Sequence, residues 1–576
     1  MSTIYLTSGN NSFTALANQS IDGQGGADTI DGSAGNDSIY NYAGGNDSFT
    51  LGSSDTVVGA LNGGDLFTVN GSGNNINTEQ GGNDTINIAS AATGNYVYMH
   101  GSTGPEQLNI ASGANTIIGS QGADNITIAG GNNGSNLIDM QEGANILVDN
   151  GGGNNTIYGA GNDSVTGGTG HDLIMTFGGN DSINAGSGNH TIDAGLGTNT
   201  IDAGTGLHEL IYSTGGSNNI TFETNTVNGA SYGFNDTLSY AYAPAAVNIS
   251  LGATSSSATI GSGVSSHTDT ITGFVGNMVL SGFNDTVAAA ATESIYGGTG
   301  SDSLNGNAGS SDTLVGGTAG HNTVLVTGTG GNDSIVGSAV GSDNISIGSG
   351  SANDTVNSET GSNDSISVGG NNAYIYTFGS TSGDHDVVSG TGDTLLGSQG
   401  SDTISITGSG SNFIEAQIGT KTITDSGSGN NTIYGGTGAS TITGGTGHDA
   451  ILGGTGNDSI TTAAAGSVTV DAGGGTNTIV SNGTDTIFSA TGGTTGNTIT
   501  LGSNAHTVVN YFYATANSET DTINGFVHGQ DIIDIPSGVS NFNVATSGSN
   551  SIVTYNNKTI DVIGDAHMQS SDFAFV

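Results

Sequence analysis

Single aliphatic residues recur at a spacing of nine along the chain, and glycine or polar residues fill the positions between them. The clearest run is Val165, Ile174, Ile183, Ile192, Ile201 and Leu210. Each aliphatic centres a very short strand with one inward side chain, and the glycine-rich remainder allows a tight turn. Two repeats make one coil of 18 residues (183 − 165 = 18), so alternate repeats lie on the same edge. The pattern predicts an all-β fold, a right-handed parallel β-helix (a β-roll or solenoid) of nonapeptide-like repeats.

The same repeat of aliphatic positions recurs elsewhere, with regular or with longer spacing. Ile30 and Ile39 follow Asp28 and Asp37, and an extra glycine then shifts the next pair to Asp47 and Phe49. A second regular run is Ile433, Ile442, Ile451 and Ile460. Asp333, Asp343, Asp354 and Asp364 recur at ten or eleven residues, each shortly before Ile or Val. We interpret these segments as the same coils with looser turns.

Two stretches break the beat. Residues 240–251 alternate polar and apolar side chains as longer strands do, and the pattern changes again from about residue 501. We therefore predict a first solenoid over residues 1–230, an interrupting β module over 231–290, a second solenoid over 291–500 and a capping segment over 501–576.

The charge balance is extreme: 49 acidic residues face two lysines, Lys421 and Lys558, for a net charge of −47. Salt bridges therefore cannot neutralise the carboxylates, and cations from solution must do so. Only 33% of the residues are apolar, which is low for one large core but sufficient for a stack that buries a narrow stripe. A disordered acidic polymer is the alternative. The regular aliphatic positions argue against disorder in the metal-loaded chain, but not in the metal-free chain.

Several classes of function are disfavoured by what the composition lacks. The chain has no cysteine, which removes disulfides and thiolate metal sites. No apolar run approaches the roughly 18 residues of a transmembrane segment, and no signal-peptide pattern opens the sequence. We expect no nucleic-acid partner, because phosphate neutralisation needs lysine and arginine.

The nine-residue unit is itself a motif, Gly-Gly-x-Gly-x-Asp-x-aliphatic, intact over residues 167–174, 297–304, 444–451 and 453–460. It offers Asp carboxylates and turn carbonyls, hard oxygen ligands that suit Ca²⁺ rather than Zn²⁺ or Cu²⁺. Asp163 and Asp181 should stack about 4.8 Å apart on one edge, where they repel unless a cation lies between them. The alternative is that Asp and Gly here merely favour turns.

These repeats resemble those of the RTX (repeats-in-toxin, hemolysin-type calcium-binding) family, closest in character to RTX surface-layer and matrix proteins. Residues 235–287 resemble a module that often interrupts such arrays, and the tail resembles the closing segment that carries a type I secretion signal. The resemblance implies Ca²⁺ held between same-edge turns by the repeat Asp and by turn carbonyls. Carried onto this sequence, the implied ligands are Asp28, Asp37, Asp47, Asp163, Gly167, Thr169, Asp172, Asp181, Gly297, Thr299, Asp302, Gly444, Thr446, Asp449, Gly453, Thr455 and Asp458.

Some positions depart from the motif. Asn199, Asn431 and Ser440 stand where Asp is expected, so we expect amide or hydroxyl ladders to replace metal there and calcium occupancy to be patchy. His190 and His208 occupy the Asp position one coil apart, on the edge of Asp172. Facing imidazoles could bind a transition metal, and the alternative is that both are degenerate turn residues.

Catalytic motifs are poor. Residues 208–212 begin like the zinc-protease motif, but Tyr212 replaces its second histidine. Residues 229–233 fit Gly-x-Ser-x-Gly without the α/β pattern that this motif requires. We therefore expect no enzymatic activity.

Together these features predict a secreted, calcium-binding structural protein that folds and self-assembles outside the cell as a surface layer, filament or biofilm matrix. The expected partners are further copies of the chain, the type I secretion machinery and, as a further candidate, cell-surface polysaccharide. Tyrosine-rich segments at 96–98, 374–376 and 511–513 are contact surfaces or simply stacked aromatics. The alternatives are an adhesin or ice-binding solenoid, with Thr-x-Thr at scattered positions such as 422–424 and 441–443, and a less favoured polysaccharide-acting RTX enzyme.

Overall fold

A computed structural model describes residues 3–78, 81–222, 225–227, 230–232, 235–252, 255–290, 292–307, 311–489, 496–503, 506–511 and 520–576. The chain divides into two compact units, Met1–Phe283 and Asn284–Val576. In the described ranges both consist of short β-strands, and the only helical elements are two single 3₁₀ turns, η1 (Gly263–Ser265) and η2 (Ser570–Asp572). The all-β prediction is confirmed.

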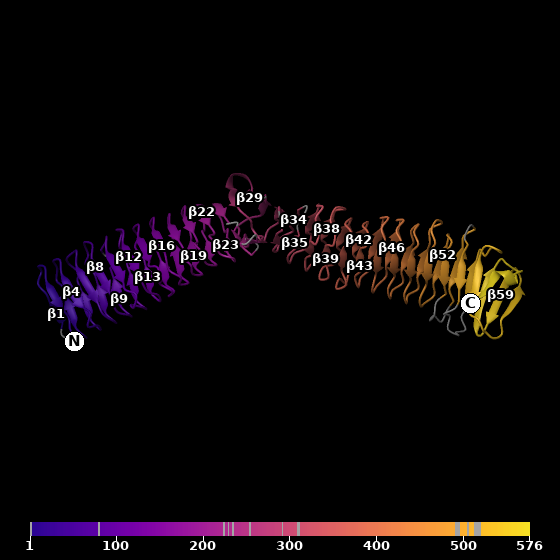
Figure 1. The fold of residues 1–576 in the computed structure, drawn as a ribbon, viewed down its shortest axis with the longest axis horizontal. Helices are drawn as coiled ribbons and strands as arrows, with labels where there is room; N and C mark the ends of the chain where they lie inside the picture. The colour runs from indigo at the N-terminus through magenta and orange to yellow at the C-terminus, as the bar shows by residue number, and fades with distance from the viewer. Residues whose placement is uncertain are drawn as a thin grey trace. The chain divides into compact units, whose positions relative to one another are not determined.

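The first unit is a stack of coils, each contributing one strand to each of two parallel sheets (Figure 1). From β1 (Thr3–Tyr5) to β24 (Ser217–Thr221), odd-numbered strands form one sheet and even-numbered strands the other. We call them the odd sheet and the even sheet. In the even sheet, β18 (Ser164–Thr166) pairs with β20 (Ser182–Asn184), which places Val165 opposite Ile183. The chain is therefore a β-solenoid, as the nine-residue spacing predicted.

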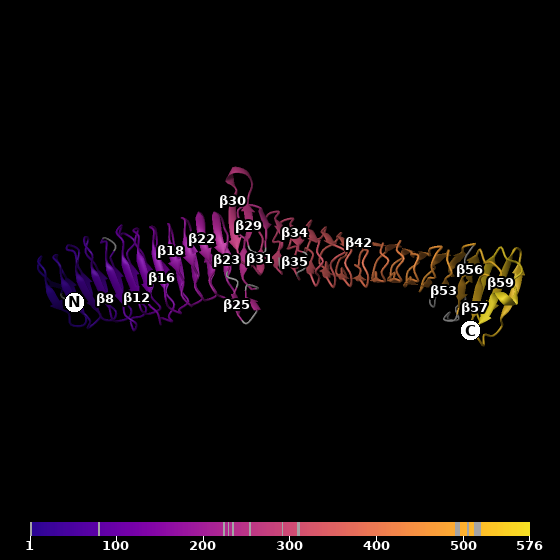
Figure 2. The same cartoon turned by 45° about the horizontal axis from the view of Figure 1, so that its top comes forward.

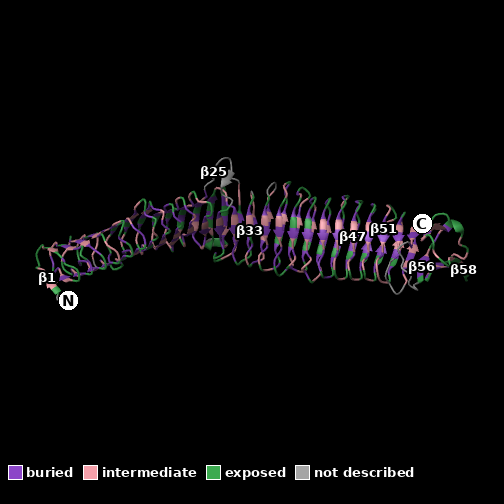
Figure 3. Ribbon diagram, turned by 60° about the horizontal axis from the view of Figure 1, so that its bottom comes forward, coloured by how far each residue is buried: buried purple, intermediate pink, exposed green. Residues whose placement is uncertain are grey.

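The core is a column of aliphatic side chains between the two sheets. The middle residue of each strand points inward, and Val165, Ile174 and Ile183 are all buried. Figure 3 shows this burial along the strands and exposure at the turns. The prediction fails at Leu210, because the turn before β23 (Leu210–Tyr212) is one residue longer and Ile211 is buried instead, opposite Ile192.

A hairpin interrupts the first unit. Strands β28 (Val247–Ser250), β29 (Ser255–Ile260) and β30 (His267–Thr272) pair antiparallel in that order. Strand β30 then joins β24 in parallel, so the hairpin extends from the even sheet (Figure 2). The alternating sequence at 240–251 contributes β28. The Gly-x-Ser-x-Gly match cannot be assessed as a site, because residues 229 and 233 lie outside the described residues.

The second unit repeats the architecture from β32 (Thr286–Ala288) to β57 (Ile532–Ile535). Thr313 lies opposite Ser334, 21 residues on, so the coils around Asp333 are the looser ones that the sequence predicted. At the C-terminal end, β58 (Asn543–Ser547), β59 (Asn550–Tyr555) and β60 (Lys558–Ile563) form an antiparallel sheet. Strand β60 pairs in parallel with β56 (Thr520–Asn524), which attaches this sheet to the last coils.

One inward position carries a carboxyl group. Asp386, in β42 (His385–Val388), lies between Ile366 and Ile404 of the neighbouring strands. It is 1% exposed, and within the described residues neither carboxyl oxygen has a hydrogen-bond partner. Burial, reinforced by the charge of Asp384, raises the pKa of Asp386 well above its usual range.

Replacing this carboxyl group should stabilise the protein. We expect Asp386→Ile to raise the free energy of unfolding by about 1–3 kcal/mol, since a buried unpartnered polar group becomes one more aliphatic of the column. The thermal midpoint in millimolar calcium measures the effect, with Asp139→Ile on the outer face as the control. A lower midpoint for Asp386→Ile than for the parent would contradict this assignment.

Candidate metal sites

A ladder of buried side chains follows one edge of the first unit, in the turns that lead into the even strands. We call it the even edge. The backbone N–H of Asp28 donates to Oδ1 of Asp47 (2.6 Å), and that of Asp47 donates to Oδ1 of Asp65 (2.9 Å). The same link continues coil by coil through Asp84, Glu106, Asp124, Asn145, Asp163, Asp181 and Asn199. All of these side chains are buried.

Asp163 and Asp181 are neighbours on this ladder, as the 18-residue coil predicted. The N–H of Asp163 donates to Oδ1 of Asp181 at 2.8 Å, and the strands that follow them pair in register. Two carboxylates one strand spacing apart repel strongly when both are ionised. Asp28 and Asp47 form a second such pair among the predicted ligands.

The odd edge, in the turns before the odd strands, begins with carboxylates. There the N–H of Asp37 donates to Oδ1 of Asp55 at 2.8 Å. The ladder then becomes a run of amides, formed by Asn74, Asn95, Asn115, Asn136 and Asn155. Both the backbone N–H and the Nδ2 of Asn95 donate to Oδ1 of Asn115, at 3.0 and 3.1 Å. In such a run the amide side chains hydrogen-bond to the next coil and carry no charge, so no cation is needed.

The same edge corrects the histidine hypothesis. The N–H of Asp172 donates to Nδ1 of His190 (3.2 Å), and the N–H of His190 donates to Oε2 of Glu209 (2.8 Å). Glu209 therefore takes the position predicted for His208, which is exposed and outside the ladder. The facing pair of imidazoles is wrong, because the longer turn before β23 shifts the register by one residue. Burial raises the pKa of Glu209 to about 8.

In the second unit the Asp residues of the intact repeats have different neighbours on the ladders. The N–H of Asp285 donates to Oδ1 of Asp302 at 2.9 Å, so these two carboxylates are adjacent. Asp449 instead accepts from the N–H of Asn431 (2.9 Å), and Asp458 accepts from that of Ser440 (2.7 Å). A run of four carboxylates lies on the even edge, formed by Asp343, Asp364, Asp384 and Asp402.

The predicted glycine and threonine positions lie in the turns that connect successive coils. The N–H groups of Thr169, Thr446 and Thr455 donate to carbonyls of the preceding coil at 2.8–3.1 Å. The backbone N–H groups of the first glycines of the four motifs each donate to a carbonyl of the following coil at 2.8 Å, namely Gly167, Gly297, Gly444 and Gly453. Thr299 lies in the turn after Gly297. A carbonyl of any of these residues as a metal ligand stays a prediction.

Many ladder carboxylates leave one oxygen without a partner. In the described part of the chain, Oδ2 has no hydrogen bond in Asp28, Asp37, Asp163, Asp302 and Asp458. Burial raises the pKa of Asp163 and of Asp458 to about 6. Burial and the Asp285 carboxylate raise that of Asp302 to about 7. A buried carboxylate with a free oxygen needs either a proton or a cation.

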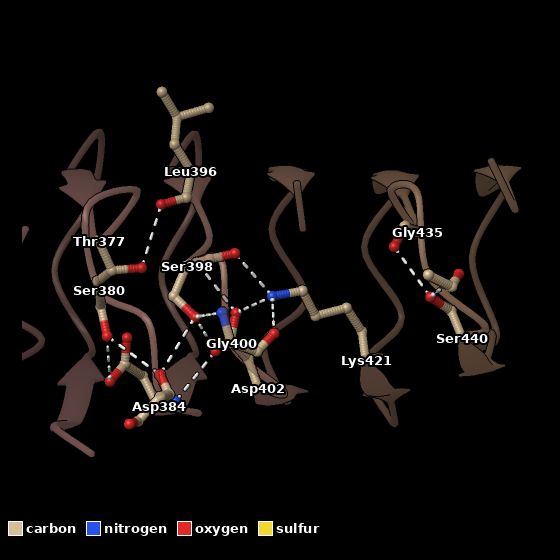
Figure 4. Close-up of polar contacts among 12 residues, drawn as sticks. Thr377, Ser380, Asp384, Leu396, Ser398, Gly400, Asp402, Lys421, Gly435 and Ser440 are labelled. Atoms are coloured by element: carbon tan, nitrogen blue, oxygen red, sulfur yellow. Dashed lines mark hydrogen bonds and ion pairs between the residues drawn. The ribbon is translucent and has the colours of Figure 1, made fainter. Parts of the chain in front are cut away.

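A lysine shows how these turns hold a cation. Lys421 follows Asp402 on the even edge, and its fully buried side chain reaches back to the preceding turn (Figure 4). Its Nζ donates to Oδ2 of Asp402 at 2.5 Å and to the carbonyls of Ser398 and Gly400 at 2.8 Å each. These are the second, fourth and sixth residues of a degenerate repeat at 397–402. One carboxylate and two turn carbonyls therefore converge on a positive charge.

The second lysine is also buried and also pairs with a buried carboxylate. Lys558, 3% exposed, lies 3.0 Å from Oδ2 of Asp521 and 5.5 Å from the centre of the Tyr511 ring. The expectation that salt bridges cannot neutralise the carboxylates is therefore corrected for Asp402 and Asp521. Histidine adds further pairs, with Nε2 of His528 2.9 Å from Asp565 and its Nδ1 2.8 Å from Asp572. The 2 lysines and 11 histidines remain far outnumbered by the 49 acidic residues.

The ladders coincide with a known repeat. The model of the RTX calcium-binding nonapeptide repeat matches residues 16–48, 100–139, 141–174, 175–206, 287–324 and 425–460. These six segments are RTX calcium-binding nonapeptide repeats. RTX nonapeptide repeats bind calcium. No curated protein matches the chain.

The residues present fit Ca²⁺. The carboxylates and turn carbonyls are hard oxygen ligands, the Oδ2 atoms without a partner among the described residues call for a positive charge, and the Lys421 ammonium takes the place of a cation. Within the described ranges, no three Asp, Glu or His side chains converge on one point, so turn carbonyls must complete any site. Bound Ca²⁺ supplies the positive charge that stacked carboxylates need.

Sequence reasoning missed several ladder residues on both edges. They are Asp55, Asp65, Asp84, Glu106 and Asp124, which continue the carboxylate runs begun by Asp28 and Asp37. A strict nine-residue motif misses Asp84 and Glu106 because the coils that lead to them have 19 and 22 residues. Asp55, Asp65 and Asp124 keep the 18-residue spacing but lack at least one glycine of the motif. A search for an acidic residue two positions before an apolar residue, with a variable turn, would have found all five.

Proposed function

We propose that this protein is a secreted, calcium-dependent structural protein that folds and self-assembles outside the cell. RTX repeat proteins are typically secreted through type I systems. The observation that carries the proposal is the ladder of buried carboxylates running through coil after coil. Such a chain has little stability of its own when those groups are ionised and unpaired. No helix in the described part of the chain is long and apolar enough to span a membrane.

The ladder residues would then act as a folding switch. In the cytosol, where free calcium is scarce, stacked carboxylates such as Asp28 and Asp47 repel, and the chain stays extended enough to be exported. Outside the cell, millimolar calcium matches the weak affinities of extracellular calcium modules, about 10⁻⁴–10⁻³ M. Carboxylates that bind the ion there convert binding free energy into folding free energy. We expect no catalytic activity from this arrangement.

Assembly is the finer part of the proposal. Copies with a net charge of −47 repel at low calcium, and cations shared between outer carboxylates would relieve that repulsion. The odd sheet exposes stacked aromatic pairs, Tyr96 with Tyr98 and Tyr374 with Tyr376. Tyr96 and Tyr374 are 41% and 43% exposed. The third tyrosine segment is different, since Tyr511 is buried and residues 512–513 lie outside the described residues.

Light scattering tests assembly separately from folding. We expect scattering of the pure protein to rise in millimolar calcium after β-structure has formed, and Tyr374→Ser with Tyr376→Ser to fold normally but scatter less. Lateral association through this face predicts at least a severalfold drop in apparent mass, because exposed aromatics dominate contact energies. A protein that folds in calcium and stays monomeric at all concentrations would remove the assembly claim.

A second candidate, an ice-binding or adhesive face, is favoured by the even sheet of the second unit. The sequence suggested only scattered Thr-x-Thr, but this is wrong, because same-sheet strands are two repeats apart. Six successive even strands carry two aligned outward columns, Thr403, Thr422, Thr441, Ser459, Thr478 and Thr498 beside Ser405, Thr424, Thr443, Thr461, Val480 and Thr500. Hydroxyls spaced about 4.8 Å between strands and about 6.7 Å along each strand form a flat, regular array.

Such an array can order surface water. Inhibition of ice recrystallisation by the calcium-loaded protein would favour this candidate, provided that Thr424→Lys with Thr443→Lys abolishes it. Thr50→Lys with Thr68→Lys, in the even sheet of the first unit, is the matched control. Equal ice growth with and without the protein would dismiss it.

A further inference from the structure

Lys421 carries an inference that goes beyond calcium binding by the repeats. An ammonium group has three N–H donors, and at Lys421 all three have acceptors: Oδ2 of Asp402 and the carbonyls of Ser398 and Gly400. The side chain is fully buried, where a lysine is rarely found without a paired charge. Every donor and the charge are therefore satisfied inside the stack.

Asp402 differs from Asp384, the carboxylate before it on the even edge, because both of its carboxylate oxygens accept hydrogen bonds. Its Oδ1 accepts from the N–H of Asp384 (3.0 Å) and from the Ser398 hydroxyl, and its Oδ2 accepts from Lys421 and from the Ser398 N–H (3.0 Å). The Oδ2 of Asp384, one coil earlier, has no partner in the described residues. In the same run Oδ2 of Asp343 accepts from the Ser338 N–H and Oδ2 of Asp364 from the Ser358 hydroxyl, so Asp402 is distinguished by the positive charge of its partner.

The ladder positions that follow Asp402 within residues 402–440 carry no further carboxylate. On the even edge the next residue is Ser440, whose hydroxyl donates to the Gly435 carbonyl at 2.9 Å. On the odd edge the N–H of Asn412 donates to Oδ1 of Asn431 at 2.9 Å. The carboxylate of Asp425 accepts from Nδ2 of Asn431 (2.7 Å) and from the N–H of Gly427 (2.8 Å). Within residues 402–440 Asp402 is therefore the one ladder carboxylate, and Lys421 supplies its counter-charge.

We propose that Lys421 is a built-in counter-ion that replaces one calcium ion, so that residues 402–440 form a metal-independent segment within a calcium-dependent solenoid. This inference rests on the proposed folding switch, because it describes a segment in which a lysine takes over the part of the cation. The segment stays folded at calcium concentrations at which the coils of the carboxylate runs are unfolded. When calcium binds, the neighbouring coils fold onto the ends of this segment.

Hydrogen exchange of the full chain tests the proposal, with calcium binding counted in parallel. In EGTA at neutral pH, amides of residues 402–440 should exchange at least about tenfold more slowly than those of residues 28–65. Lys421→Met should remove this protection, because it leaves the Asp402 carboxylate buried and unpaired. Lys558→Met, which removes the other buried lysine, is the matched control and should leave residues 402–440 unchanged.

Lys421→Asp is the second variant. It restores a carboxylate next to Asp402, so the chain should bind one more calcium ion, lose its protection in EGTA and regain it in calcium. Equal exchange of residues 402–440 and 28–65 in EGTA, or no additional calcium bound by Lys421→Asp, would overturn the inference. If both segments are open in EGTA and close in calcium, the inference alone fails. If both are closed in EGTA, the folding switch fails as well.

Discussion

At about pH 7.5 the calcium-free chain is expected to be largely unfolded, and at about pH 5 it should recover most of its β-structure without any metal. The reason is that burial raises the pKa of ladder carboxyls above that of an unfolded chain. Burial and neighbouring carboxylates raise the pKa of Asp47 to about 6 and those of Asp84 and Glu106 to about 7. The even edge therefore holds protons that the unfolded chain releases.

The sign follows from linkage. A group whose folded pKa is raised contributes stability that is complete below its unfolded pKa, near 4, and is lost as the pH rises through the folded value. The calcium-free stability should thus fall between about pH 4 and pH 7. One pKa unit is worth about 1.4 kcal/mol, so a ladder of such groups outweighs the roughly 5–15 kcal/mol of a typical domain.

Circular dichroism of the EGTA-treated protein across this pH range measures the effect. Because the sequence pI is about 4.1, light scattering must show that the acid form is soluble. Calcium should abolish most of the pH dependence above about pH 6, since bound cations displace the protons. A calcium-free protein that is folded at neutral pH and loses structure on mild acidification would contradict the ladder account.

The second large effect is expected at one pair of ladder residues, where a substitution should change the stability in opposite directions with and without calcium. Asp163→Asn with Asp181→Asn should stabilise the calcium-free protein by about 1–3 kcal/mol and destabilise the calcium-loaded protein by a similar amount. Without calcium, the substitution removes the repulsion between the two carboxylates and extends an amide ladder with Asn145 and Asn199. With calcium, it removes the anionic ligands of that position.

Thermal midpoints in EGTA and in millimolar calcium give the two signs, and equilibrium dialysis counts the calcium lost. Asp139→Asn is a matched control, because Asp139 is a half-buried residue on the outer face of β15 (Leu137–Asp139) and its side chain accepts a local hydrogen bond from the Gln141 N–H. It should move neither midpoint by more than a few tenths of a kcal/mol. If the double variant is destabilised equally in both conditions, Asp163 and Asp181 have only a structural role.

The fold could be predicted from the sequence because each short strand depends on one inward aliphatic, and Val165, Ile174 and Ile183 are spaced by an invariant repeat. The prediction failed where a turn changed length without changing the local pattern. Leu210 and Ile211 are both plausible core residues, and only the pairing of β23 with β21 (Thr191–Asp193) decides between them. The extra residue in the turn before β23 also places His208 outside the ladder.

The candidate sites were predicted less completely, because they depend on which coils are neighbours. Asp163 and Asp181 were recognised from their 18-residue spacing, but Asp84 and Glu106 are 22 residues apart and still adjacent. Lys421 carries no motif in the sequence. Its role is visible only when the carbonyls of Ser398 and Gly400 are placed around its ammonium group.

A calcium titration of the EGTA-treated protein at about pH 7.5, followed by far-UV circular dichroism, tests the central claim most directly. The account predicts little β-structure at the start and a cooperative rise at about 10⁻⁴–10⁻³ M calcium, with magnesium far less effective. A protein that is already folded in EGTA at neutral pH and does not respond to calcium would contradict it, because the ladder carboxylates would then need no cation.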